Sequence, residues 1–257
     1  GFSFVLMTSG ELRSFGRNHY GQLGNDSVFD TKQSQVIFQS GVKDVSCGNL
    51  HTVVLLDDGS LWTMGENERG QLGSGGFDDS AKPVKVVGSD VVSIDSGYQN
   101  SYFLKTNGEL WGMGANRDGQ LGVLPNETTD ARSNQPVKIV SEVTEFSSGG
   151  WSLIYTRNDG KLFGLGYTGW AQFGIKESYF QFSPQEVNVS GVERIEVTHD
   201  TNAIWLQNNV FSVSGSNEGS KLMLGHDTAK ISNFVKSNFE TPRSYSGGSE
   251  HALLVDN

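Results

Sequence analysis

The sequence predicts an all-β protein built from about five similar units, and three observations lead to this fold class. A glycine-rich motif recurs along the 257 residues, Asp-Gly and Asn-Gly pairs follow apolar runs, and no long stretch has helical periodicity. Glycine accounts for 33 residues and proline for only 5, so glycine punctuates an ordered chain here and does not build a collagen-like one.

The repeated motif reads Gly-x-Leu-x-x-x-Gly-x-Asn-x-x-Gly-Gln-Leu-Gly in three close copies, at residues 10–24, 59–73 and 108–122. A looser copy runs over 160–174, and a degraded one holds Gly215, Asn217 and Leu224-Gly225. The central glycine of the motif recurs after 49, 49, 52 and 49 residues, at Gly16, Gly65, Gly114, Gly166 and Gly215. A fixed period of this length indicates a repeat architecture.

Each unit begins with an apolar strand, a glycine, two variable residues and a second apolar strand. Val45–Gly48 and His51–Leu56 illustrate the pattern, and Asp58-Gly59 then supplies a turn. Asn107-Gly108 and Asp159-Gly160 stand at the same point of later units. Such pairs favour type I′ hairpin turns, which need positive φ at both central residues, so we expect strand, turn and strand in each unit.

The strand that follows the turn carries large side chains on both faces, as Leu61–Met64 does. Such a strand must be covered on both sides, and a unit of about fifty residues buries too little surface to fold alone. We therefore expect the units to stack, radially or linearly. The most ambiguous stretch, Ile231–Phe239, lies where the other units have an outer strand.

Composition limits the function classes. A net charge of -10 argues against direct binding of nucleic acid, whose affinity comes from Lys and Arg side chains on phosphates. Cys47 is the only cysteine, which excludes an intrachain disulfide and a cysteine-based zinc cluster. No apolar run is long enough for a membrane helix. The chain starts at Gly1, so we expect an upstream segment and leave localisation open.

The residues of enzymes and cofactor sites are not arranged as such sites require. The five histidines have no metal-ligand spacing, and no Gly-x-Ser-x-Gly elbow or Gly-Lys-Ser/Thr phosphate loop is present. Asp57-Asp58 and Asp78-Asp79 lack the alternating oxygen ligands of a calcium loop and read as solvated turns. His51 and His251 share one repeat position and read as structural hydrogen-bonding residues. We therefore predict no enzyme activity, no cofactor and no metal.

The motif, preceded by Gly-x-x-His-Thr at residues 48–52, resembles the repeat of the regulator of chromosome condensation family along essentially the whole chain. Kelch units have a similar period, so the motif and not the period carries the resemblance. The resemblance implies a β-propeller of four-stranded antiparallel blades, about five present of seven, in one domain over 1–257. The repeats then lie near 2–47, 48–96, 97–148, 149–197 and 198–247, with 248–257 starting a further blade.

The resemblance also implies roles within the repeat. The central glycines permit close backbone approach, the motif asparagines bond the local loop backbone, and Gln-Leu-Gly inserts a leucine between blades. Thr168 and Thr198 depart from the pattern. Phe2–Thr8 and His251–Val255 occupy the same repeat position, so we expect an incomplete ring from a longer chain, with a closed five-bladed ring as the alternative.

Aromatic residues fall at two kinds of position. Trp62, Trp111 and Phe163 share a strand position and are predicted to be core, whereas Tyr98 and Trp151 lie in the variable loop. In the family this loop builds the face that meets partners, and simple packing at the rim is the alternative for these two aromatics. By resemblance the partner face of this chain contains Asn49, Leu50, Tyr98, Gln99, Gly150, Trp151, His199, Asp200, Ser249 and Glu250.

The resulting hypothesis is a non-enzymatic scaffold that binds a protein partner through one loop face. The alternative is guanine-nucleotide exchange on a small GTPase, the activity of the family's founder. Photoreception, a third activity of the family, is disfavoured because only Trp151 stands where several tryptophans are needed. The closely spaced repeats favour an extracellular setting or the cell surface of a bacterium, with cytoplasm or nucleus as the alternative.

Overall fold

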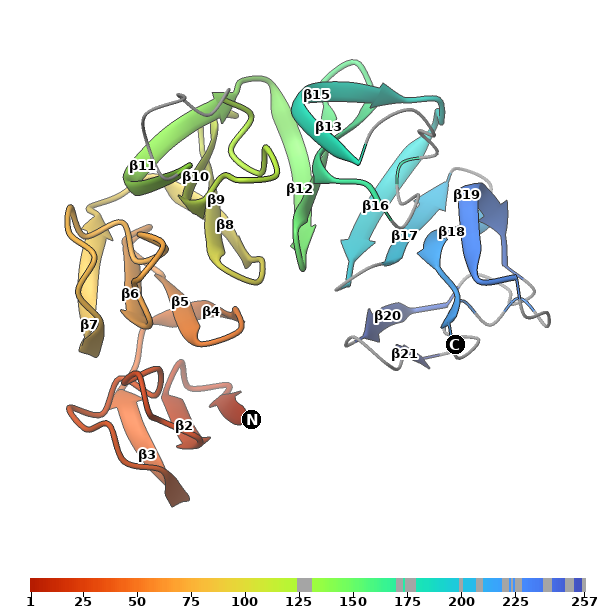
Figure 1. Cartoon of the computed structure of the whole chain (residues 1–257). Coiled ribbons are helices and arrows are strands. Elements are labelled where there is room, and N and C mark those ends of the chain that lie inside the picture. The colour runs from red at the N-terminus through yellow and green to blue at the C-terminus, as the bar shows by residue number, and fades with distance from the viewer. Residues whose placement is uncertain are drawn as a thin grey trace. The chain divides into compact units, whose positions relative to one another are not determined.

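The computed structural model describes residues 1–123, 131–169, 173, 179–198, 201–206, 210–218, 222, 224, 228–237, 242–247 and 252–255. The elements that it places there are all β-strands, as Figure 1 shows, and this confirms the all-β prediction. The chain forms two compact units. Unit 1 comprises Gly1–Arg117 with Pro125–Ser141, and unit 2 comprises Asp118–Leu124 with Glu142–Asn257.

Unit 1 contains three antiparallel sheets, each with its strands paired in chain order. The first sheet has three strands, β1 (Phe2–Leu6), β2 (Leu12–Gly16) and β3 (Thr31–Phe38). The second has β4 (Val42–Cys47), β5 (His51–Leu56), β6 (Leu61–Gly65) and β7 (Ser80–Val87). The third has β8 (Val91–Ser96), β9 (Asn100–Lys105), β10 (Leu110–Ala115) and β11 (Arg132–Val140).

Unit 2 repeats this plan in two four-stranded sheets and one two-stranded sheet. One sheet has β12 (Val143–Gly149), β13 (Ser152–Arg157), β14 (Leu162–Tyr167) and β15 (Phe180–Val187). The next has β16 (Val192–Val197), β17 (Thr201–Leu206), β18 (Val210–Ser216) and β19 (Lys230–Lys236). The last pairs β20 (Ser244–Gly247) with β21 (Ala252–Val255).

Four of these six sheets are the four-stranded antiparallel blades that the sequence predicts. The ambiguous stretch Ile231–Phe239 supplies the outer strand β19, over Lys230–Lys236. The four-stranded sheets start at Val42, Val91, Val143 and Val192, a few residues before the expected repeat boundaries, because the boundary of a periodic chain is a matter of convention. β1 pairs with the strand after it as β5 does with β6, and β21 pairs with the strand before it as β5 does with β4.

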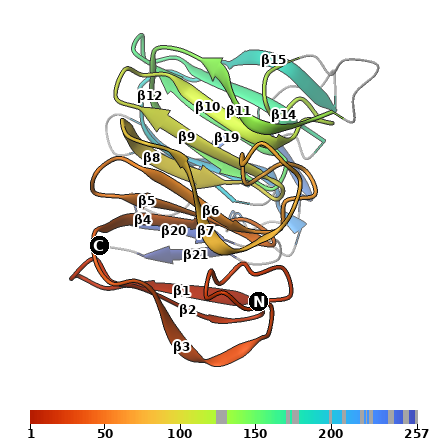
Figure 2. The same cartoon turned by 90° about the vertical axis from the view of Figure 1, so that its left-hand side faces the viewer.

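The core of unit 1 lies between its sheets, which Figure 2 shows as successive layers. On β5, Val54 packs toward the first sheet, with Leu12 and Met64, while Val53 and Leu55 pack toward the third, with Phe103. A fully buried Val, Leu or Phe stabilises the fold by about 1.5–3 kcal/mol relative to exposure. Central blades therefore need apolar residues on both faces of their strands, as the sequence indicates.

The hairpin turns after the second strand differ from the prediction. Only the glycine has positive φ, 76° at Gly59, while Asp58 is not in the left-handed region. The Gly59 N–H donates to the Leu56 carbonyl at 3.0 Å, and the Leu56 N–H donates to Ser60 at 3.0 Å. The loop thus has three residues, a turn closed by a left-handed glycine, and not the two residues of type I′. Asp58 instead accepts the Ser60 N–H at 2.9 Å, which holds the turn.

Candidate partner-binding face

Antiparallel pairing places two connections of every blade at the same end. The hairpin between the first and second strands and the long loop between the third and fourth strands both lie at what we call the loop end. In unit 1 the hairpins centre on Asn49-Leu50 and Tyr98-Gln99. The sequence-predicted residues are thus the central residues of these hairpins.

The hairpins share one geometry. The Gly48 N–H donates to the His51 carbonyl at 3.0 Å, and the Gly97 N–H donates to the Asn100 carbonyl at 3.0 Å. In unit 2 the Thr198 N–H makes the same bond to the Thr201 carbonyl at 2.9 Å, so the threonine that departs from the motif keeps this hydrogen bond.

The residue after the central glycine of the motif holds the hairpin through a backbone hydrogen bond. The residue after that glycine donates its N–H to the second loop residue: Glu66 to Leu50 at 2.9 Å, and Ala115 to Gln99 at 3.0 Å. In unit 2 the same bond joins Tyr167 to Trp151 at 2.9 Å. Each loop carbonyl is therefore held in place by the backbone of the third strand.

Only glycine fits this position. Gly65 has φ of 108°, and a Cβ there would lie 2.5 Å from the Leu50 carbonyl oxygen and 2.8 Å from the His51 Cα. The predicted role of the central glycines, close backbone approach, is confirmed.

The glycine at the start of the hairpin serves a different purpose. Gly48 does not have positive φ, but a Cβ there would overlap the ring of His51 and lie 2.8 Å from the Gly97 carbonyl oxygen. This residue is glycine because the histidine ring and the next blade occupy the space.

His51 lies beneath the hairpin and is fully buried. Its buried ring nitrogens make no hydrogen bond of full geometric quality, but the ring interacts with the Asn100 backbone, so its structural hydrogen-bonding role stays a prediction. Burial lowers the pKa of His51 to about 4, although the nearby Asn100 backbone opposes part of that shift. The imidazole is therefore neutral at pH 7 and acts by filling space. His251 lies outside the described residues.

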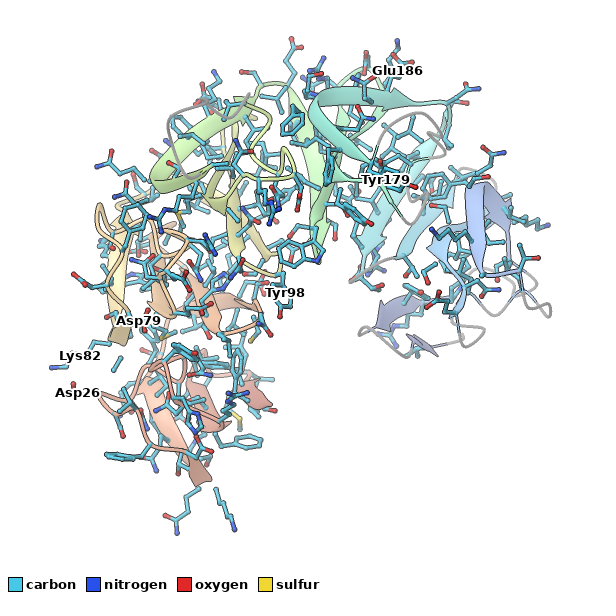
Figure 3. All side chains as sticks on the ribbon, in the orientation of Figure 1. Asp26, Asp79, Lys82, Tyr98, Tyr179 and Glu186 are labelled. Carbon is cyan, nitrogen blue, oxygen red and sulfur yellow. The ribbon has the colours of Figure 1, made fainter. Side chains whose placement is uncertain are left out.

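The structure brings the two predicted hairpins of unit 1 together. The Asn49 N–H donates to the Tyr98 carbonyl at 3.2 Å. Asn49 is exposed, whereas Leu50, Tyr98 and Gln99 are half-buried. Figure 3 shows Tyr98 at the edge of unit 1, near β4 and β8.

In unit 2 the hairpin between β12 and β13 carries Gly150, which is buried, and Trp151, which is half-buried. The remaining predicted residues of the face lie outside the described part of the chain: His199, Asp200, Ser249 and Glu250.

The motif asparagines organise the long loops, as predicted. Asn67 accepts the Leu72 N–H at 2.9 Å and donates to the Gly76 carbonyl at 3.1 Å and the Asp78 carbonyl at 3.0 Å. Asn18 likewise accepts the Leu23 N–H at 2.9 Å. These loops are therefore held by side-chain amides.

The motif leucines Leu23, Leu72 and Leu121 are buried, as the insertion between blades requires. In the degraded fifth copy Asn217 accepts the N–H of Leu222, at 2.9 Å. Leu222 and not Leu224 thus occupies the motif's leucine position.

Sequence reasoning missed the contribution of the long loops to the loop end. The Asp26 N–H donates to the Ala81 carbonyl of the next blade at 2.9 Å, so the first long loop rests on β7. Exposed Phe29 and Phe77 stand in these loops. Their signal in the sequence is an aromatic residue among aspartates just before an outer strand.

Trp62, Trp111 and Phe163 are half-buried, and so are less enclosed than a core position implies. Trp62 and Trp111 pack against the clusters between blades. Cationic side chains cover their outer faces, with the Lys105 ammonium 4.6 Å from the ring centre of Trp111.

Among the charged groups of the loop end, Glu66 has a raised pKa, first because of burial and then because of the charges of Asp79 and Glu68. In the described part of the chain, no group of three or more His, Cys, Asp and Glu side chains could hold a metal ion. The same residues include no helix long and apolar enough to cross a membrane.

Several solved structures share this fold. Human WBSCR16 matches with a TM-score of 0.86 at 21% identity, covering 100% of this chain and 70% of that one. Yeast RCC1 (Prp20), in a complex with Kap60, matches with a TM-score of 0.87 at 17% identity, covering 99% of this chain and 66% of that one. Prp20p from Saccharomyces cerevisiae, described with its binding to Gsp1p and histones, matches with a TM-score of 0.85 at 16% identity, covering 100% and 67%.

The chain thus spans about two thirds of the two yeast chains, and at these identities the likeness shows the fold, a β-propeller. A search of curated proteins found no match. Sequence models of the Regulator of chromosome condensation (RCC1) repeat match residues 9–55, 58–104 and 107–154, and a second model of that repeat matches 42–71 and 91–120. Because these matches cover more than half of the 257 residues, the chain belongs to the RCC1 repeat family.

Proposed function

We propose that this chain is a non-enzymatic interaction module that binds a protein partner through the hairpins at the loop end of its blades. The observation that carries the proposal is the pair of clamped hairpins in unit 1, where the Asn49 N–H bonds to Tyr98 and the third strands bind the carbonyls of Leu50 and Gln99. A surface whose backbone is already fixed loses little conformational entropy when a partner binds.

The side chains suit such a role. Tyr98 and Trp151 are half-buried, so each has one side packed and another side accessible. Aromatic residues in this state are typical interface anchors, because they bury a large area with few rotatable bonds. The net charge of -10 favours a protein partner over nucleic acid.

The experiment compares partner binding by the full chain and its variants. A partner captured on the immobilised chain is identified and purified, and its affinity is measured for Tyr98→Ala, Leu50→Ser and Trp151→Ala. We expect the Tyr98 and Trp151 variants each to weaken binding about tenfold, the loss of an anchor. Asp57→Ala, an exposed residue at the opposite end of the blade, is the control. Unchanged affinity in all three loop variants would refute the assignment of the face.

A second candidate is guanine-nucleotide exchange on a small GTPase. Two observations favour it: the full length of this chain shares its fold with Prp20p, and Prp20p is described with its binding to Gsp1p. The chain would then displace nucleotide through protein contacts alone. Release of a fluorescent GDP analogue from purified small GTPases should accelerate when the chain is added, and rates equal to the intrinsic ones would exclude this activity for the GTPases tested.

A further inference from the structure

Two long loops of unit 1 expose aromatic side chains away from the hairpins. Phe29, between β2 and β3, is 78% exposed, and Phe77, between β6 and β7, is 42% exposed. Val28 beside Phe29 is exposed as well. Large apolar residues at such exposure mark interaction surfaces when they occur together.

These aromatics stand on fixed backbone. In the first loop Asn18 donates to the Ser27 carbonyl at 2.7 Å, and its N–H donates to the Asp30 carboxylate at 2.8 Å. Val28 and Phe29 lie between these two anchored residues. In the second loop Asn67 binds the residues on both sides of Phe77, at 3.1 and 3.0 Å. The exposure is therefore built into the motif and is not the result of a loose loop.

The first loop adjoins β7, the strand that follows the second loop. The Asp26 N–H donates to the Ala81 carbonyl at 2.9 Å, and the Lys82 ammonium lies 3.0 Å from the Asp26 carboxylate, just after the second loop ends. Figure 3 shows Asp26, Lys82 and Asp79 in succession along one side of unit 1. Together the loops form what we call the acidic–aromatic band: Asp26, Val28, Phe29, Phe77, Asp78 and Asp79.

The chemistry of the band selects a cationic ligand. Aspartates flank its phenylalanines in the sequence, and one guanidinium already contacts it, since Arg132 lies 4.0 Å from the ring centre of Phe77. The Lys82 ammonium faces the band at Asp26, and the His19 imidazole lies 3.3 Å from Asp30. Phe29 is more exposed than Phe77, and no cation contact to its ring is seen among the described residues.

We propose that the acidic–aromatic band binds an extended cationic segment of a partner protein, in which Arg or Lys alternates with aliphatic residues. The aliphatic side chains pack on Val28, Phe29 and Phe77, while the cations approach the ring faces and the Asp78 carboxylate. This surface is separate from the hairpins of the proposed partner face, so an experiment can refute one of the two binding proposals and leave the other standing.

The test measures binding of a fluorescent peptide, Arg-Leu repeated four times, to the full chain at low ionic strength by anisotropy. The comparison peptide repeats Arg-Gly and carries the same charge. We expect the Arg-Leu peptide to bind about tenfold more tightly, because only it can use the rings. Equal binding of both peptides would show attraction to the net charge of the chain alone and would overturn the proposal.

Variants locate the binding. Phe29→Ser combined with Phe77→Ser should weaken binding about tenfold, and Asp78→Asn should weaken it about twofold and lower its salt dependence. Val235→Ser, at an apolar residue 40% exposed on β19, and Asp57→Asn are the matched controls and should bind like the parent. Tyr98→Ala should also keep peptide binding, which separates this surface from the hairpins.

Circular dichroism checks that each variant is folded. If the double variant unfolds, peptide binding is measured on Phe29→Ser alone, which changes a largely exposed side chain. Two further results would overturn the proposal. One is full peptide binding by the Phe29→Ser variant. The other is a chain that self-associates through these phenylalanines, seen by sedimentation, and does not bind the peptide.

Discussion

The central glycines offer a sharp prediction about stability, and Gly65→Ala is the clearest case. Its φ of 108° lies outside the range that suits alanine, and the new Cβ would lie 2.5 Å from the Leu50 carbonyl oxygen and 2.8 Å from the His51 Cα. Backbone strain of about 1–3 kcal/mol adds to about 1 kcal/mol for the lost Glu66 to Leu50 hydrogen bond. We expect the free energy of unfolding of the Gly65→Ala variant to be about 2–4 kcal/mol lower than that of the parent chain.

Urea unfolding, followed by tryptophan fluorescence and far-ultraviolet circular dichroism, measures this change. Two matched glycines separate its causes. Gly41 has φ of 77° but open space around its Cβ position, so Gly41→Ala should cost only about 1–2 kcal/mol. Gly88 has neither positive φ nor a neighbour within 4 Å, so Gly88→Ala should leave stability within about 0.5–1 kcal/mol of the parent. Equal losses of stability in Gly65→Ala and Gly88→Ala would refute the idea that the close backbone contact at Gly65 holds the hairpin.

Three further predictions concern single side chains. Burial lowers the pKa of His51 from 6.5 to about 4, so the unfolded chain binds the proton more readily than the folded one. The free energy of unfolding should therefore fall by up to about 3 kcal/mol as the pH drops from 6.5 to about 4. His51→Gln should remove this part of the pH-dependent change in the urea midpoint. Asn67→Ala should cost about 2–4 kcal/mol in the same assay, because it leaves the Leu72 N–H and two carbonyls without their partner, and a loss below the error of the measurement would contradict this role. Lys82→Gln should change stability by less than about 1 kcal/mol, since its ion pair with Asp26 is exposed, and a larger loss would show that the pair does more than neutralise charge.

The sequence carries most of the fold because its strongest signals are local. The sequence predicts which glycines need positive φ, which asparagines bond their own loop, and which strands are apolar on both faces. Gly65, Asn67 and Val53 confirm these three predictions. The three-residue turn at 57–59 could not be predicted, because Asp58-Gly59 suits two turn types, which differ in the φ of Asp58 and in the hydrogen bond from Gly59 to Leu56.

The candidate site was less accessible to sequence reasoning. The hairpin residues could be assigned by their place in the repeat, yet the bond between Asn49 and Tyr98 depends on packing between blades. The sequence analysis did not single out Phe29, because its exposure becomes apparent only when the hydrogen bonds from Asn18 to Ser27 and Asp30, on either side of it, are known. The sequence shows that His51 occupies a repeat position, but its complete burial depends on packing between blades and could not be predicted.

The most direct test of the account is amide hydrogen exchange at the residues that clamp the hairpins. The N–H groups of Glu66 and Ala115 donate to Leu50 and Gln99, so they should exchange as slowly as the central amides of β5 if the hairpins are a preformed surface. Exchange of both amides at the rate of an unstructured peptide, while β5 stays protected, would contradict the claim that the repeat holds these loops ready for a partner.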